Sequence, residues 1–255
     1  MNSEFIDKVV IVTGGGHGIG RAYVKHFHSL GASVVIAEID AKAADQLALE
    51  LQQGPGKVIA VTTDVTSPDS LHKMAGKTIE AFGRIDVLIN NAAIFISVPM
   101  SRSPFDEISV QEWDRMMAVN LKGPWLASCA VAPQMQHQGY GKIINISSGT
   151  ALKGAGNRIH YVTTKAGILG FTKTLANELG KYNICVNCIA PGSTMSEENP
   201  DETVLKHRAS ATATRALKRV QTPEDMLGAV EFLASKASDF ITGQTLVVDG
   251  GSCMH

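Results

Sequence analysis

The sequence has few cysteines, few aromatic residues and no excess of charge of one sign. Its 255 residues include only four cysteines, too few and too scattered for a disulfide scaffold, so we expect free thiols. Aromatic residues make up 5% of the chain, and the core is therefore expected to be aliphatic. Lys and Arg number 23 against 24 Asp and Glu, with no block of one sign, so the chain offers nucleic acid no basic stripe.

Long apolar runs are also missing. Stretches such as Val9 to Val12 are far shorter than the roughly 18 residues that a bilayer span needs, so we expect no membrane anchor. Glu4 and Asp7 precede the first apolar run without a cationic segment, which argues against a secretory signal and favours a cytoplasmic location. The eight histidines form no HExxH or similar cluster, so no metal is predicted.

What the chain does contain is an alternation of short β-branched runs with longer helical patterns, the sequence form of repeated βαβ units. The apolar residues within each run are contiguous, as in parallel strands covered by helices on both faces. We therefore predict an α/β fold over residues 1–255, a single Rossmann-type doubly wound domain with a seven-stranded parallel sheet flanked by helices. The predicted strands are Lys8–Thr13, Ser33–Glu38, Lys57–Asp64, Asp86–Asn90, Lys142–Ser147, Ile184–Ile189 and Thr245–Asp249.

The first predicted strand runs directly into a glycine-rich turn, Thr13-Gly-Gly-Gly-His-Gly-Ile-Gly20, which is followed by helical periodicity. Glycines let the backbone approach a pyrophosphate, whose charge the free N–H groups and dipole of the next helix stabilise. A purely structural turn is the alternative for such a pattern taken alone.

Glu38 ends the second predicted strand, 18 residues after Gly20. An acidic side chain at about this spacing accepts hydrogen bonds from the adenosine ribose and repels a 2′-phosphate, so NAD is favoured over NADP. His17 and Arg21 lie close by, but neither removes that repulsion. The alternative is that Glu38 only solvates the end of a strand.

Three motifs together resemble the short-chain dehydrogenase/reductase family over essentially the whole chain: the glycine turn, Asn90-Asn-Ala-Ala93, and Tyr161-X-X-X-Lys165. Ala93 stands where the family usually has glycine. Ser148 precedes Tyr161 by 13 residues, the spacing of the family's catalytic serine. The resemblance implies the catalytic residues Asn120, Ser148, Tyr161 and Lys165. It also implies the cofactor-binding residues Gly14, His17, Gly18, Ile19, Gly20, Glu38, Asp64, Val65, Asn91, Ala92, Tyr161, Lys165, Pro191, Gly192 and Thr194, and a homotetramer.

Tyr161 and Lys165 are four residues apart on a predicted helix and so share one face. A neighbouring ammonium favours the phenolate, so we expect Lys165 to lower the pKa of Tyr161 and make it a general base. The resemblance assigns Ser148 to the substrate oxygen and Asn120 to a water-linked proton relay. Ser147 is the rival for the serine role, and strand geometry allows only one of the two to reach the site. His160 is a weaker candidate for the pocket.

Two further features invite functional interpretations. Cys185-Val-Asn-Cys188 has the spacing of a redox or zinc motif, but positions three apart in a strand face opposite sides, so we interpret both as structural thiols. The helix around Asn120 carries apolar residues on more than one side, which indicates core packing or a subunit contact.

The substrate pocket is expected from residues 94–100, 150–158 and 193–217, the last forming a polar lid. Lys153 and Arg158 are candidates to pair with a carboxylate, although surface solvation is the ordinary explanation. The predicted activity is NAD-dependent oxidoreduction of a small-molecule secondary alcohol or ketone. An NADPH-dependent 3-oxoacyl thioester reductase and a non-enzymatic NAD-sensing protein are the alternatives.

Overall fold

The computed structural model describes residues 4–95, 100–197 and 200–254 and contains a parallel sheet of seven strands, in the order β3-β2-β1-β4-β5-β6-β7. This confirms the predicted fold class. The strands are β1 (Val9–Thr13), β2 (Ser33–Glu38), β3 (Val58–Thr62), β4 (Val87–Asn90), β5 (Gly141–Ile146), β6 (Ile184–Pro191) and β7 (Thr245–Val248).

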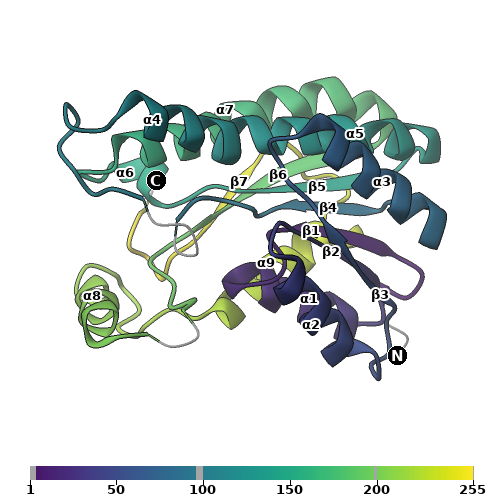
Figure 1. Cartoon of the computed structure of the whole chain (residues 1–255), viewed down its shortest axis with the longest axis horizontal. Coiled ribbons are helices and arrows are strands. Elements are labelled where there is room, and N and C mark those ends of the chain that lie inside the picture. Colours follow the sequence, from purple (N-terminus) through teal and green to yellow (C-terminus); the bar gives the residue numbers. More distant parts are fainter. Residues whose placement is uncertain (1–3, 96–99, 198–199, 255) are drawn as a thin grey trace.

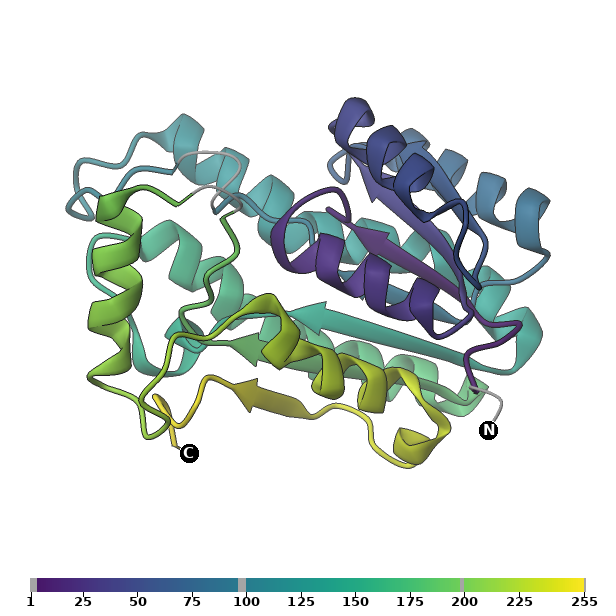
Figure 2. The same cartoon turned by 90° about the horizontal axis from the view of Figure 1, so that it is seen from below.

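Helices cover both faces of the sheet (Figure 1). One face carries α3 (Pro68–Phe82), α4 (Val110–Met117), α5 (Gly123–Gln138) and α7 (Ile159–Leu179), and the other carries α1 (Gly18–Ser29), α2 (Ala41–Leu51) and α9 (Leu227–Ala234). The short helix α6 (Thr150–Lys153) precedes α7, and α8 (Glu202–Thr212) stands beyond the carboxyl ends of the strands (Figure 2). Single turns are η1 (Ala118–Lys122), η2 (Gly180–Tyr182), η3 (Pro223–Met226) and η4 (Lys236–Ser238).

The contiguous apolar runs supply two cores, one on each face of the sheet. Val10 and Val12 of β1 pack in the cluster that includes Tyr23 of α1, whereas Ile11 packs in the cluster that includes Leu71 of α3. Successive side chains of a strand point to opposite faces, so a strand buried on both sides needs an apolar residue at every position. This is why the runs show no polar alternation.

Some element boundaries differ from the prediction. β3 ends at Thr62 rather than Asp64, and β5 ends at Ile146, which leaves Ser147 outside the strand. The helix that carries Asn120 is interrupted by the π-helical turn η1 between α4 and α5. Apolar periodicity alone carries no signal for such a turn, which is frequent at functional sites.

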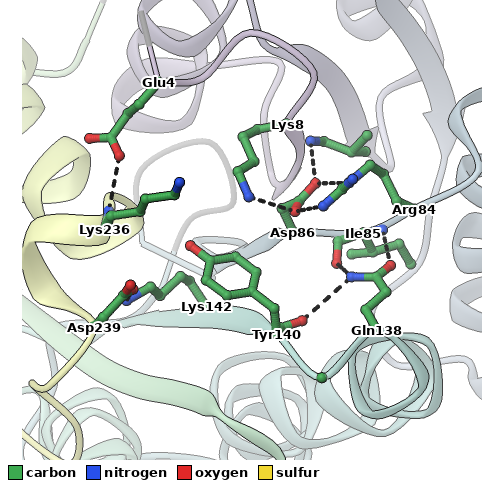
Figure 3. Close-up of polar contacts among 12 residues, drawn as sticks. Glu4, Lys8, Arg84, Ile85, Asp86, Gln138, Tyr140, Lys142, Lys236 and Asp239 are labelled. Carbon is green, nitrogen blue, oxygen red and sulfur yellow. Dashed lines mark hydrogen bonds and ion pairs between the residues drawn. The ribbon is translucent and has the colours of Figure 1, made fainter.

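A buried polar network joins the amino ends of the central strands, at the edge opposite the glycine turn (Figure 3). The Asp86 side chain is fully buried and accepts hydrogen bonds from Lys8 Nζ at 3.1 Å, from Val9 N at 2.9 Å, and from Arg84 Nε and Nη2 at 2.7 Å each. Lys8 Nζ also lies 4.3 Å from the ring centroid of Tyr140. A buried carboxylate is tolerated only with such partners.

The two cysteines of the CxxC pattern do not converge. Both lie in β6, where the Cys185 thiol donates to Asp239 O and Cys188 is fully buried. All four cysteines are free, and no group of three or more metal-ligating side chains occurs among residues 4–95, 100–197 and 200–254. Within the same residues, no helix is long and apolar enough to cross a membrane.

Candidate active site

A cavity of about 610 Å³ opens where the strands end at their carboxyl termini, the edge at which ligands bind in doubly wound folds. Of the predicted catalytic residues, Ser148, Tyr161 and Lys165 line it, and Asn120 does not. The predicted cofactor-binding residues that line it are Gly14, His17, Gly18, Ile19, Gly20, Glu38, Asp64, Val65, Asn91, Ala92, Tyr161, Lys165, Pro191, Gly192 and Thr194.

The glycine turn is too crowded for side chains at two of its positions. A Cβ on Gly20 would lie 2.0 Å from Gly14 O, and Gly14 itself has a φ of +63° with Ala92 Cα 2.8 Å from its would-be Cβ. Gly14 therefore needs the left-handed conformation that glycine adopts without strain, and Gly20 allows the helix to approach the strand closely. The tight turn expected from the sequence follows from these contacts.

The turn is held against the end of β4 by Asn91 and Thr13. Asn91 Nδ2 donates to Thr13 O at 3.1 Å and to Gly14 O at 3.0 Å, while Thr13 Oγ1 accepts the backbone N–H groups of Asn91 and Ala92. These bonds satisfy polar groups of the turn that would otherwise be unpaired in a part-buried position. Asn91 thus positions the turn as well as lining the cavity.

Helix α1 begins at the turn with its amino end open. His17, the N-cap residue, makes no side-chain capping bond, and the first helical turn contains no acidic residue. Among the described residues, the leading N–H groups and the positive end of the helix dipole therefore have no side-chain acceptor, an arrangement that suits an anion such as a pyrophosphate.

Glu38 is buried beside the same turn. Its Oε2 accepts the N–H of Gly16 at 3.0 Å, and its Oε1 accepts the N–H groups of Ile39 and Asp40 at 2.9 and 3.2 Å. The carboxylate is thus fixed at the end of β2 and is not free in solvent, so the interpretation that Glu38 only solvates a strand end is wrong.

The basic side chains near Glu38 already contact acids. His17 Nε2 lies 3.3 Å from Asp40 Oδ2, and Arg21 Nη2 forms an ion pair with Glu50. Lys25 Nζ also contacts Glu50, at 2.6 Å, so Arg21 and Lys25 share one carboxylate. His17 and Arg21 thus each have an acidic partner other than Glu38.

The two serines after β5 have different partners. Ser147 Oγ donates to Lys165 O of α7 at 2.6 Å, so it holds the helix against the strand end. Ser148 Oγ accepts hydrogen bonds from Thr150 N and Oγ1, and Ser148 acts to lower the pKa of the Tyr161 hydroxyl. The alternation of side chains along a strand does not distinguish the two serines, because both lie outside β5. Their different hydrogen-bond partners distinguish them.

Tyr161 is 6% exposed and stacks on Phe95, with ring centroids 5.0 Å apart. Burial raises the pKa of the Tyr161 hydroxyl, whereas the hydrogen bond to Ser148 and the charges of Arg158 and Arg208 act in the lowering direction. Phe95 falls within the predicted segment 94–100, of which residues 96–99 lie outside the described residues.

Lys165 is held against the end of β5. Its Nζ donates to Ile146 O at 2.8 Å and lies 5.9 Å from the Tyr161 ring centroid. Burial lowers the pKa of Lys165 to about 8. The electrostatic effect of Lys165 on the pKa of Tyr161 stays a prediction.

Asn120 and His160 have partners that the sequence did not indicate. Asn120 Oδ1 accepts the N–H of Ile94 at 2.7 Å and its Nδ2 donates to Ile94 O, so the side chain holds the segment after β4. The relay role of Asn120 stays a prediction. His160 is fully buried, its Nε2 lies 3.1 Å from Glu112 Oε1, and it does not line the cavity.

The predicted lid is anchored by two buried arginines. Arg208 of α8 donates from Nη1 to Ser193 Oγ and from Nη2 to Glu197, and Arg215 donates from Nη2 to Ser193 O. Arg208 is only 5% exposed and lines the cavity, so it is not part of a solvated polar cover. Glu198, assigned to the same cover, lies outside the described residues.

These features fit a dinucleotide. The uncapped start of α1, the tight glycine turn and the fixed Glu38 carboxylate lie at one end of the cavity, and Tyr161, Ser148 and Lys165 line the same cavity. A dinucleotide across the strand ends requires this combination of an anion site, a ribose acceptor and a reactive centre.

Comparison with known proteins gives matches to reductases and dehydrogenases over nearly the whole chain. The family model described as enoyl-(acyl carrier protein) reductase matches residues 14–253. The chain is 37% identical to the 3-oxoacyl-(acyl-carrier-protein) reductase FabG of Thermotoga maritima, covering 96% of this chain and 97% of the relative. It is also 37% identical to the L-rhamnose 1-dehydrogenase (NAD(P)(+)) of Azotobacter vinelandii, covering 96% of each.

Proposed function

Because the chain belongs to the short-chain dehydrogenase/reductase family and is thus an oxidoreductase, we propose that it uses NAD to interconvert a secondary alcohol and its ketone. The observation that carries this proposal is that Tyr161, Ser148 and Lys165 line the same cavity as the glycine turn. The residues that would hold the cofactor are the glycine turn, Glu38, Lys165 and the Pro191–Gly192 segment.

The bound nicotinamide would supply the acceptor or donor of the hydride. The side chains would transfer the proton and orient the substrate. In oxidation, Tyr161 Oη takes the proton of the substrate hydroxyl, and Ser148 Oγ bonds to the substrate oxygen. In reduction, Tyr161 donates that proton. Because burial raises the pKa of Tyr161, the phenol is protonated at neutral pH, so rising pH should favour oxidation.

The charges around Glu38 support NAD as the cofactor. A 2′-phosphate would meet the Glu38 carboxylate, and the neighbouring His17 and Arg21 side chains already contact Asp40 and Glu50. Like charges placed together are costly, whereas ribose hydroxyls donate hydrogen bonds to a carboxylate.

The direct test is a panel of secondary alcohols, sugars and hydroxy acids followed at the NADH absorbance band, with NAD and NADP compared. Tyr161→Phe should lower turnover by about 10²- to 10⁴-fold, because it removes the proton-transfer group. The same variant should retain NAD affinity in a fluorescence titration. Unchanged turnover in Tyr161→Phe would refute the assignment.

A second candidate is the NADPH-dependent reduction of 3-oxoacyl thioesters. It is favoured by the FabG relatives of Thermotoga maritima and of Chlamydia muridarum, 37% and 38% identical to this chain. Turnover of an acetoacetyl thioester with NADH and with NADPH distinguishes the two candidates: faster reduction with NADPH supports this one.

We also propose that the enzyme is a cytoplasmic homotetramer. Two apolar side chains on adjacent helices remain open to solvent in the monomer, Val110 of α4 at 69% and Trp125 of α5 at 48% exposure. Apolar surface of this kind is suited to contacts between subunits. A monomeric mass in light scattering at micromolar concentration would contradict the homotetramer.

A further inference from the structure

We propose that the substrate carries a carboxylate group, which the Arg158 guanidinium binds beside Tyr161. This inference rests on the proposed function, because it names the class of alcohol that the same site oxidises. It assigns Arg158 as a residue that selects the substrate, separately from the residues that transfer the proton.

Arg158 is the N-cap residue of α7, three positions before Tyr161, and its half-buried side chain lines the cavity. It makes no hydrogen bond or ion pair with any residue in 4–95, 100–197 or 200–254. Burial, and then the charges of Arg102 and Arg208, lower the pKa of Arg158. A partly buried guanidinium normally has an acidic partner, and here none of the described residues supplies it.

Arg208 offers a second donor in the same cavity. The Arg208 guanidinium is neutralised by Glu197 through Nη2, and Nη1 is used by Ser193, but its buried Nε has no partner among the described residues. Both arginines line the cavity together with Tyr161, and their charges act to lower the pKa of the Tyr161 hydroxyl.

Three of the described acids also line the cavity, and none of the three forms an ion pair with Arg158. Glu38 ends β2 and Asp64 follows β3, at the end of the cavity where the glycine turn lies. Asp249 is 3% exposed, and its Oδ1 accepts the N–H groups of Gly251 and Ser252. Its Oδ2 lies 3.5 Å from the position that a Cβ on Gly149 would take, beneath the backbone that follows Ser148.

Two other cations line the cavity, Arg115 and Lys153, the latter with its Nζ 2.7 Å from Ser252 Oγ. An anionic substrate therefore meets a surplus of positive charge around Tyr161. Arg158 is not an ordinary surface arginine whose charge is solvated by water, because its side chain is half buried within the cavity.

A carboxylate matches the planar shape of Arg158 better than a phosphate does. Among the described residues Arg158 has no acidic partner, whereas Glu197 already balances Arg208. One planar guanidinium matches one planar monoanion through two parallel hydrogen bonds. A phosphate dianion would need Arg115 or Lys153 as a second cation, so hydroxyalkyl phosphates are the competing probe in the test.

The test compares hydroxy acids with neutral substrates of the same skeleton. The probes are 2-, 3- and 4-hydroxycarboxylates of four to six carbons and their methyl esters, oxidised with NAD. We expect the wild-type kcat/KM to favour the acid over its ester by at least about tenfold for one member of the series. In Arg158→Gln this ratio should fall by about 10- to 100-fold, the range for losing a charge-assisted pair. Arg158→Lys, which keeps the charge but not the planar fork, should lie between.

Arg102→Gln is the matched control. Arg102 is exposed, acts on Arg158 only through its charge, and does not line the cavity, so its removal should leave the acid-to-ester ratio within about twofold. A binding readout complements turnover: butyrate should inhibit ester oxidation by the wild type competitively, and butyramide should not. If Arg158→Gln fails to fold in thermal unfolding, Arg158→Lys and this competition decide the question.

The outcomes separate the two proposals. Oxidation of neutral alcohols with NAD but equal kcat/KM for acids and esters would overturn the carboxylate inference and leave the proposed function intact. A preference for hydroxyalkyl phosphates over carboxylates would also overturn it. NAD-dependent oxidation of no alcohol in either series would instead overturn the proposed function.

Discussion

Glu38→Gln should change the choice between NAD and NADP, because it removes the charge of Glu38 while nearly preserving its shape. The Glu38 side chain ends β2 and is held by the N–H groups of Gly16, Ile39 and Asp40 at 2.9 to 3.2 Å. Its position is therefore set by the backbone, and an amide oxygen can keep part of that bonding. The substitution tests charge more than geometry.

The size of the effect follows from Coulomb's law. Two like unit charges about 4 to 6 Å apart repel by about 3 to 4 kcal/mol at an effective dielectric of about 20. Salt and partial hydration of a phosphate reduce this to about 2 to 3 kcal/mol, which corresponds to about 30- to 140-fold in relative kcat/KM. The amide also gives up at least one charge-assisted bond to the turn, so the free energy of unfolding should fall by about 1 to 3 kcal/mol.

The assay is kcat/KM for NAD and for NADP with one alcohol, together with urea unfolding of each variant. The NAD to NADP ratio should fall by the amount above, mainly through a gain with NADP. Asp45→Asn is the control, because Asp45 is exposed on the neighbouring α2 and does not line the cavity. A change in ratio of less than about threefold in Glu38→Gln would refute the electrostatic explanation of cofactor choice.

Three further predictions concern the turn, the buried lysine and the polar network. Gly20→Ala should weaken NAD binding by at least about tenfold in a fluorescence titration, because the added Cβ would lie 2.0 Å from Gly14 O and would force the turn to shift. Burial lowers the pKa of Lys165 to about 8, so from pH 8 to 10 the unfolded chain binds more protons than the folded one. The stability of the cofactor-free protein against urea should therefore rise over that range, and Lys165→Met should remove the rise. Asp86→Asn should lower the free energy of unfolding by about 2 to 4 kcal/mol, since it disrupts a buried ion pair. The KM for NAD should stay constant, because Asp86 lies at the opposite edge of the sheet from the cavity. A large change in that KM would contradict the separation of the polar network from the cofactor site.

The strands and the turn could be predicted because their signals are local. A contiguous apolar run such as Val34–Ala37 has to be covered on both faces, and βαβ repetition then leaves little choice of architecture. The glycine turn is equally local, since a tight strand-to-helix junction excludes side chains at Gly14 and Gly20. The fold and the glycine-turn end of the cavity can therefore be predicted from short segments of the sequence.

The catalytic end depends on contacts between distant segments, and there the sequence was less informative. The spacing of Tyr161 and Lys165 predicted that both share one helix face, but it did not predict the bond from Lys165 Nζ to Ile146 O. The π-helical turn at Asn120 has no periodic signature. That no described residue gives Arg158 an acidic partner can be seen only when its neighbours in the fold are known.

The charge of the substrate and the basicity of Tyr161 are coupled under the carboxylate proposal. Arg158 is one of the groups that lower the pKa of the Tyr161 hydroxyl against the effect of burial. A carboxylate bound to Arg158 would offset that positive charge and leave the phenol harder to ionise, whereas a neutral ester would not. Oxidation of an acid should therefore need a higher pH than oxidation of its ester. During reduction of an oxo acid, the Tyr161 phenol should stay protonated, and thus able to donate its proton, up to a higher pH. The same guanidinium that selects an acid thus also affects the pH at which that acid is oxidised.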